Sequence, residues 1–393
     1  NHFNESPCND VTFTGLNHID GLQSINDPNM FRYMDIFSYE SINKGFTVKI
    51  VTTPQKELIK TTIEAKIESL SDLLKLIQDY PLNDDVEYNI DMKSLHNIND
   101  PLKKLNNMIG MKNLKMNIID QVLYYIQGLH KNGDNISSID FMHTVIYGPP
   151  GTGKTEIAKI MGEIFSKLGI LKKGTFKKVT RSDLVAGYLG QTAIKTTEVI
   201  TECLGGCLFI DEAYALGNTE KKDSFSKECI DTLCEALSNH KEELMVIIAG
   251  YEHELNECFF SYNRGLESRF TWRFKTDEYN GEQLYEIFVK MVKDCGWTIE
   301  EYDDKKGSES RINASWFQNN MDYFKYFGRD IETIFAKTKI AHSRRVFCLA
   351  DSEKRIITMK DLESGLVLFL ENDEVKKRKG ESSRNTSLFG LYV

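Results

Sequence analysis

The sequence predicts an α/β protein in which helices cover both faces of a parallel sheet, with a small helical domain after it and a small α+β domain before it. The sheet is predicted because short apolar runs alternate with amphipathic segments of helical period through the middle of the chain, as they do where helices connect parallel strands. The helical domain is predicted because strand-like runs stop at about residue 279 and helical periods follow.

The chain has 393 residues, which is more than one ordinary domain contains, so we expect it to divide. The predicted regions are an irregular N-terminal arm at 1–40, the α+β domain at 41–99, a large α/β domain at 100–276, the helical domain at 277–371 and a charged tail at 372–393.

The elements of the α+β domain follow from local patterns. Apolar and polar residues alternate at 46–51 and 62–67, which predicts strands there. Ser71 is expected to cap a short helix that ends before Pro81. Pro101 then marks the boundary to the large domain.

The large and helical domains are expected to contain regular elements throughout. Strands are predicted at 142–147, 176–180, 206–210, 244–249 and 270–275, with helices between them at 154–168, 190–203 and 224–239. Later helices are predicted at 280–295, 314–324, 329–345 and 360–371.

The composition argues against nucleic acid as a partner and against a zinc site. A net charge of -9 argues against nucleic acid as the main partner, because phosphate binding requires clustered Lys and Arg. For the basic run at 376–379, a solvated tail is favoured over a nuclear-import or phosphate-binding patch. The 8 cysteines form no Cys-x-x-Cys pair, so we expect reduced thiols in the cytoplasm or another reducing compartment and no zinc site.

No segment has the pattern of a membrane anchor or leader. The chain contains no apolar run of about twenty residues, and it does not open with a charged and then apolar stretch. We therefore expect no transmembrane helix, no membrane partner and no signal peptide, although the chain begins at Asn1 rather than Met and its natural start could be missing.

Residues 148–155 (GPPGTGKT) match the phosphate-binding motif G-x-x-x-x-G-K-[ST], and they follow an apolar strand and open a helix, as the motif requires. Its glycines allow backbone N–H groups to wrap phosphates at the positive end of the helix dipole. Lys154 is expected to neutralise the β- and γ-phosphates of ATP, and the Thr155 hydroxyl to bind Mg²⁺. The other predicted nucleotide contacts in this stretch are Pro149, Pro150, Gly151, Thr152, Gly153 and Glu156.

Two acidic residues follow the apolar run at 207–210. Asp211 is expected to hold Mg²⁺, and Glu212 to polarise the water that attacks the γ-phosphate. An apolar strand that ends in two acids is also a common strand exit. Its position beyond the phosphate-binding motif favours the catalytic interpretation, and together the two motifs predict ATP and Mg²⁺ as cofactors and ATP hydrolysis as the reaction.

The motifs GPPGTGKT at 148–155 and LFIDEAYAL at 208–216 resemble those of the AAA+ ATPases. More narrowly, the chain resembles the branch that contains stage V sporulation protein K and the red-type Rubisco activase, CbbX. Further matching stretches, in the family's order, are RSDLVAGYLGQT at 181–192, IIAGY at 247–251 and NRGLESRF at 263–270. The resemblance covers roughly 101–345 and implies a phosphate-binding sheet domain with a small helical lid.

The resemblance also implies roles for residues that spacing alone does not assign. Tyr188, Leu189 and Gly190 look like a pore loop, which grips a polypeptide threaded through a hexameric ring. Arg269 looks like an arginine finger, which reaches the γ-phosphate bound to the neighbouring subunit.

Arg329 looks like the sensor 2 residue of the lid, and Ile109-Gly110 match the site where the family holds adenine. The sequence departs from the family at Tyr251, where many relatives have an Asn. It departs again at Arg264 and Glu267, where the family motif has Pro and Arg, so the finger assignment rests on Arg269.

We therefore predict an Mg²⁺-dependent ATPase that forms a homo-hexameric ring and remodels or threads a protein client, which the first 100 residues would recruit. A nucleic-acid motor or loader on the same core is the alternative, and the acidic composition and aromatic pore loop disfavour it. A nucleotide-switched scaffold with little turnover is a further alternative, disfavoured by the complete Asp211-Glu212 pair.

Overall fold

A computed structural model of the chain describes residues 58–131, 140–188, 190–217, 223–300, 311–372 and 375–376. Nearly all of these belong to one compact unit, Lys60–Val393. The predicted arm at 1–40, the predicted strand at 46–51 and residues 377–379 of the basic run lie outside the described residues.

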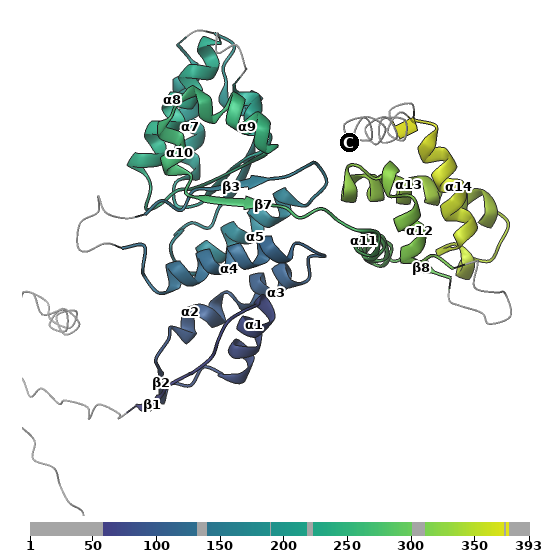
Figure 1. Cartoon of the computed structure of the whole chain (residues 1–393), viewed down its shortest axis with the longest axis horizontal. Coiled ribbons are helices and arrows are strands. Elements are labelled where there is room, and N and C mark those ends of the chain that lie inside the picture. The colour runs from purple at the N-terminus through teal and green to yellow at the C-terminus, as the bar shows by residue number, and fades with distance from the viewer. Residues whose placement is uncertain are drawn as a thin grey trace, which may run out of the picture. The chain divides into compact units, whose positions relative to one another are not determined.

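A parallel five-stranded sheet forms the centre of the large domain, in the order β4-β5-β6-β3-β7 (Figure 1). Its strands are β3 (Thr144–Tyr147), β4 (Phe176–Val179), β5 (Cys207–Ile210), β6 (Met245–Gly250) and β7 (Trp272–Lys275). All four pairings between neighbouring strands are parallel. The predicted fold class, a parallel sheet between helices, is confirmed.

Helices cover both faces of this sheet (Figure 1). On one face lie α4 (Lys112–Ile126) and α5 (Lys154–Lys167), and on the other lie α7 (Thr192–Cys203), α8 (Ser224–Asn239), α9 (Glu252–Cys258) and α10 (Gly265–Arg269). Strand β6 shows why both faces need cover. Met245 and Ile247 join one hydrophobic cluster and Val246 and Ile248 the other, because successive side chains of a strand point to opposite faces.

The region before the sheet consists of β1 (Ile59–Thr61), α1 (Leu70–Asp79), β2 (Val86–Tyr88), α2 (Met92–Asn97) and α3 (Asn99–Asn106). Strands β1 and β2 pair with each other. The buried residues of α1 and α3 belong to the same hydrophobic cluster as those of α4 and α5. Pro101 lies in the first turn of α3, where its missing N–H costs nothing.

Two local predictions in this region are wrong. The strand expected at 62–67 does not form, because the Asn89 side chain pairs with the backbone N–H and C=O of Ile63 at 2.8 and 3.3 Å and takes the place of a ladder partner. The helix cap is Ser69 rather than Ser71: the Ser69 hydroxyl accepts from the Asp72 N–H at 3.2 Å, and Ser71 lies inside the helix.

The region after the sheet, which we call the lid, contains α11 (Gly281–Asp294), α12 (Ala314–Asn319), α13 (Phe327–Val346) and α14 (Met359–Leu370). Two short parallel strands, β8 (Thr298–Ile299) and β9 (Ile356–Ile357), also form, although helical periods alone were expected here. Within the described ranges, no helix is both long and apolar enough to cross a membrane. The domain boundaries at 99/100, 276/277 and 371/372 remain our proposal.

Candidate nucleotide-binding and hydrolysis site

The loop between β3 and α5 has a backbone that requires glycine. Gly151 and Gly153 adopt φ values of 77° and 83°, a conformation that disfavours residues with a Cβ. At Gly151 a Cβ would also lie 2.0 Å from the carbonyl oxygen of Tyr326. The loop leads directly into the N-terminus of α5, where unpaired N–H groups and the helix dipole favour an anion.

Lys154, the first residue of α5, bends back over this loop. Its Nζ donates to the carbonyl oxygens of Gly148 and Pro149 at 2.8 and 2.7 Å. Burial lowers the pKa of Lys154 to about 8, although Asp211 and Glu212 act in the opposite direction. The ammonium group therefore lies over the phosphate-binding loop and within electrostatic reach of the two acids.

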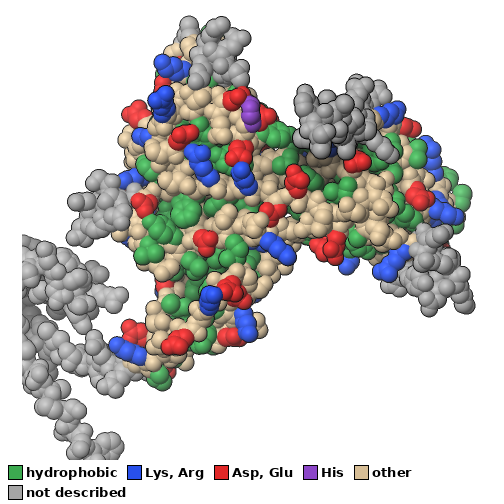
Figure 2. All heavy atoms as spheres, viewed as in Figure 1, with side chains coloured by type: hydrophobic (Ala, Val, Ile, Leu, Met, Phe, Trp, Pro, Cys, Tyr) green, Lys and Arg blue, Asp and Glu red, His purple; other side chains and the backbone are tan. Residues whose placement is uncertain are grey.

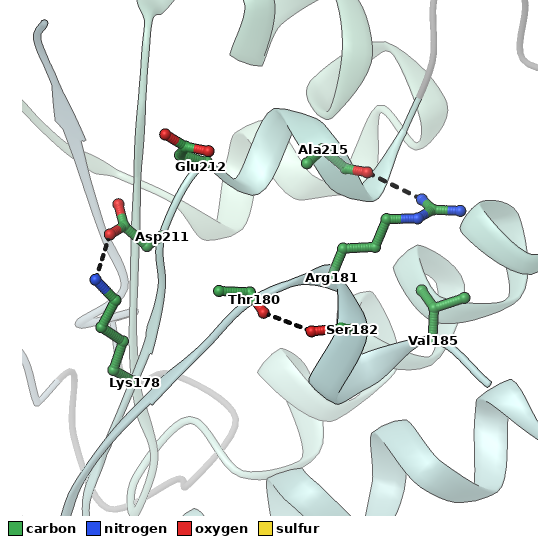
Figure 3. Close-up of a pocket in the computed structure, with 8 residues that line it drawn as sticks. All are labelled: Lys178, Thr180, Arg181, Ser182, Val185, Asp211, Glu212 and Ala215. Carbon is green, nitrogen blue, oxygen red and sulfur yellow. Dashed lines mark hydrogen bonds and ion pairs between the residues drawn. The ribbon is translucent and has the colours of Figure 1, made fainter. Parts of the chain in front are cut away.

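Asp211 and Glu212 follow β5 at the carboxyl end of the sheet, the edge where ligands of open parallel sheets bind. Glu212 has a φ of 51°, a strained conformation for a residue other than glycine. The Asp211 carboxylate forms an ion pair with Lys178 of β4, with an Nζ–Oδ2 distance of 2.6 Å (Figure 3). Lys178 was missed by the sequence reasoning, because its place beside Asp211 depends on the order of the strands.

A single pocket of about 440 Å³ brings most of the predicted site residues together. It is lined by the phosphate-binding loop, the start of α5, the two acids, the end of β6 and the lid. The predicted site residues in its lining are Pro150, Gly151, Gly153, Lys154, Thr155, Glu156, Asp211, Glu212 and Arg329. Residues lining it that the sequence did not assign include Tyr214, Tyr251, Met291 and Gly328.

The predicted adenine site lies beside this pocket rather than in its lining. Ile109 and Gly110 form part of the connection between α3 and α4, and Gly110 has a φ of 68°. Their neighbours Met108 and Met111 reach the phosphate-binding loop: a Cβ at Gly153 would lie 3.2 and 3.3 Å from their terminal methyl groups. The segment thus contacts the end of the loop through thioether side chains.

Thr155 and Asp211 offer a hydroxyl and a carboxylate to the same pocket. Among the residues that the structure describes, no group of three or more His, Cys, Asp or Glu side chains is placed to hold a metal ion. Few protein ligands suit Mg²⁺, which keeps several waters and takes phosphate oxygens as ligands at nucleotide sites. The donor set therefore fits a magnesium ion that arrives with a nucleotide.

Arg269 does not line the pocket of its own chain. It is the last residue of α10, and its guanidinium donates to the Ser238 hydroxyl of α8 and to the Gly265 carbonyl, both at 2.6 Å. Arg264, on the same segment, is exposed. The hydrogen bonds hold the Arg269 side chain outside the lining of the nucleotide pocket.

The predicted pore loop follows α6 (Arg181–Leu184), and its Tyr188 side chain is 75% exposed. Leu189 lies outside the described residues. Arg181 holds the base of this loop in place. Its guanidinium donates to the Ala215 carbonyl at 2.9 Å (Figure 3), and also to the Ser226 hydroxyl at 2.8 Å. Arg181 begins the family-like stretch at 181–192, but the sequence assigned no role to it, since its partners come from elements farther along the chain.

A second pocket, of about 540 Å³, lies between the loop base and the acids (Figure 3). One wall is formed by α6 and the end of β4, and the other by Asp211, Glu212 and Ala215. The base of the predicted pore loop and the predicted hydrolytic residues therefore share a cavity.

The sequence and its motifs are similar to those of known proteins. The family described as "ATPase family associated with various cellular activities (AAA)" matches residues 144–274. A CfxQ-like protein of Acanthamoeba polyphaga mimivirus is 39% identical over 287 residues, which is 73% of this chain and 68% of that protein. A CfxQ homologue of Pyropia yezoensis is 33% identical over 270 residues, which is 67% of this chain and 86% of that protein.

The chain belongs to the AAA+ ATPases. Stage V sporulation protein K of Bacillus subtilis is also similar, with 36% identity over 210 residues, 51% of this chain and 64% of that protein. The predicted place of the chain in the branch of CbbX and stage V sporulation protein K is thereby confirmed. As an AAA+ ATPase, the protein binds ATP and hydrolyses it.

Proposed function

We propose that this AAA+ ATPase is Mg²⁺-dependent, acts as a hexameric ring, and uses hydrolysis to thread or remodel a protein client. The observation that carries the proposal is the shared cavity: the acids that face the nucleotide pocket also face the base of the loop that presents Tyr188. A movement of the two acids on hydrolysis would therefore change the walls of this cavity and displace the base of the Tyr188 loop.

The proposed division of labour in the nucleotide pocket follows from its chemistry. Backbone N–H groups of the loop and the Lys154 ammonium would bind the phosphates. Glu212 would accept the proton of the attacking water, since Asp211, the acid that directly follows β5, is assigned to Mg²⁺ and Glu212 is the other acid that lines the pocket. Thr155 and Asp211 would hold Mg²⁺, which when bound neutralises phosphate charge.

The release of Asp211 from Lys178 is part of the same proposal. The ion pair occupies one carboxylate oxygen of Asp211 at 2.6 Å. Lys178 thus acts as a competitor for the carboxylate that we assign to Mg²⁺, and it holds that side chain in place beside the pocket.

Tyr188 is proposed to grip the client. An exposed aromatic ring beside a glycine contacts apolar side chains and backbone without requiring one sequence. In the face that Figure 2 shows, Lys and Arg side chains are interspersed with Asp and Glu, which does not favour a nucleic-acid track. The first 100 residues are proposed to recruit the client.

The test uses a Glu212→Gln protein, in which ATP is bound but not hydrolysed, incubated with ATP and a cell extract. We expect protein clients to be retained by the Glu212→Gln protein and lost from the double variant that also carries Tyr188→Ala. The double variant with Tyr188→Phe keeps the aromatic side chain and should retain the clients. ATPase activity of Tyr188→Ala alone should stay near that of the parent.

Client retention and remodelling that survive Tyr188→Ala would contradict the threading proposal. ATPase stimulation by single- or double-stranded nucleic acid, with a steep salt dependence, would instead favour the nucleic-acid alternative.

A further inference from the structure

The phosphate-binding loop is in direct backbone contact with the lid. The N–H of Gly328, in the first turn of α13, donates to the carbonyl oxygen of Gly151 at 3.0 Å. The first N–H groups of a helix have no acceptor within the helix, so Gly151 supplies a cap that α13 lacks from its own side chains. The Tyr279 hydroxyl makes a second, longer contact, to the Thr152 carbonyl at 3.4 Å.

The approach leaves no room for side chains. A Cβ at Gly151 would lie 2.0 Å from the Tyr326 oxygen and 2.9 Å from the Arg329 nitrogen. A Cβ at Gly328 would lie 2.8 Å from the Gly151 oxygen. Glycine on both sides therefore permits this contact. The motif G-x-x-x-x-G-K-[ST] requires glycine at 148 and 153, and so accounts for neither Gly151 nor Gly328.

Phe327, directly before Gly328, is held in a strained conformation. Its φ is 40°, a value that is uncommon and strained for a bulky residue. The buried ring packs edge to face on Tyr279, with centroids 5.6 Å apart. Tyr279 thus touches both the loop and the residue that aims the Gly328 N–H.

These contacts orient the donors of the loop. In a trans peptide the C=O and N–H point in opposite directions, so the bond to the Gly151 carbonyl also sets the direction of the Thr152 N–H. The contact to the Thr152 carbonyl does the same for the Gly153 N–H. Neither of these two N–H groups has an acceptor in the described part of the chain, and Gly153 itself lines the nucleotide pocket.

We propose that Gly328 and Tyr279 are positioning residues that hold two successive peptide planes of the phosphate-binding loop, so that the lid sets the affinity for the phosphates shared by ADP and ATP. The inference rests on the proposed role of the loop N–H groups. It assigns to the lid backbone a function separate from that of the Arg329 side chain, which lines the pocket itself.

The experiment measures the dissociation constants of ADP and of a non-hydrolysable ATP analogue for the full chain by calorimetry. Gly328→Ala should weaken both by about tenfold, equal to about one neutral hydrogen bond. Tyr279→Phe loses a longer bond and should weaken both by about threefold. Tyr285→Phe is the matched control, since Tyr285 lies in α11, shortly after Tyr279, and its ring packs on Phe317.

Thermal unfolding without nucleotide separates this role from a merely structural one. Ala is a better helix former than Gly and offsets the lost hydrogen bond, so the Tm of Gly328→Ala should change little while its affinity falls. If Gly328→Ala does not fold, the nucleotide affinities of Tyr279→Phe, which lacks a single hydroxyl, test the proposal.

Two results would overturn the inference. One is parental affinity for both nucleotides in folded Gly328→Ala and Tyr279→Phe. The other is a loss confined to the ATP analogue, which would assign Gly328 to sensing of the γ-phosphate, as we expect for Arg329→Ala. A parent that binds neither nucleotide would instead contradict the proposed function.

Discussion

At the scale of single residues, Lys154 connects the phosphate-binding loop to the acids. Burial lowers its pKa to about 8, below the ordinary value of 10.5 for a lysine. Phosphates favour the charged form, so affinity for ADP should fall as pH rises through 8 and be about tenfold weaker at pH 9 than at pH 7. Calorimetric titration with ADP at several pH values measures this.

Folding stability depends on pH in the opposite direction to ADP affinity. Between about pH 8 and 10.5 the unfolded chain binds the proton that the folded chain has lost, so this group's contribution to stability rises with pH in that window. Lys154→Arg keeps its charge and should bind ADP with a flat pH profile. An equally flat profile in the parent would show that Lys154 remains charged above pH 8.

At the scale of elements, Asp361 joins α14 to α13. Its carboxylate accepts from the N–H of Thr358, the N-cap residue of α14, and from Arg345 of α13, and it contacts His342 Nδ1 at 3.0 Å. Burial alone raises the pKa of Asp361, but these hydrogen bonds outweigh it and hold the pKa at about 2. Asp361→Asn should lower the free energy of unfolding by about 3 kcal/mol, because it leaves Arg345 without its charge partner.

Urea unfolding of the two proteins measures the difference, with the exposed Glu363→Gln on the same helix as the control. The carboxylate contributes stability above pH 3.8, and this is lost as pH falls through about 2. Asp361→Asn should not show that acid-dependent loss. Equal stabilities at pH 7 would mean that the helix pair does not depend on this cluster.

At the scale of the whole molecule, the position of Arg269 predicts a site shared between subunits. Arg269→Ala should lower kcat by about 10³-fold while leaving ADP affinity unchanged, because Arg269 lies outside its own pocket. The exposed Arg264→Ala on the same segment is the control. Hydrolysis rates and ADP titration measure the two effects.

A mixing experiment tests the sharing directly. Arg269→Ala and Glu212→Gln proteins, each inactive alone, should regain up to about a quarter of parental activity when assembled together at equal amounts, since a quarter of the sites would pair an intact Glu212 with a neighbour's intact Arg269. Light scattering of the Glu212→Gln protein with ATP measures the ring size. No recovery in proven mixed rings would place the required arginine elsewhere.

Much of this architecture is readable from local patterns. The sheet strands and the main helices fall within a few residues of their predicted places, because apolar period and glycine-rich turns are local signals. Two of the failures, the strand at 62–67 and the Ser71 cap, come from side-chain hydrogen bonds of Asn89 and Ser69 to backbone groups. A third, the short strands β8 and β9, depends on the pairing of segments far apart in the chain. The roles of Arg269, Tyr188 and Arg329 stay predictions.

The sequence by itself determined the fold class, the family and the phosphate-binding loop, since each depends on residues that are adjacent or regularly spaced. Only the tertiary structure decided which groups act on that loop and on the acids from outside. Lys178 reaches Asp211, Arg181 reaches Ala215, and Gly328 reaches Gly151. The physical reason is that these contacts require the strand order and the docking of the lid, which join residues far apart in the chain and leave no local pattern.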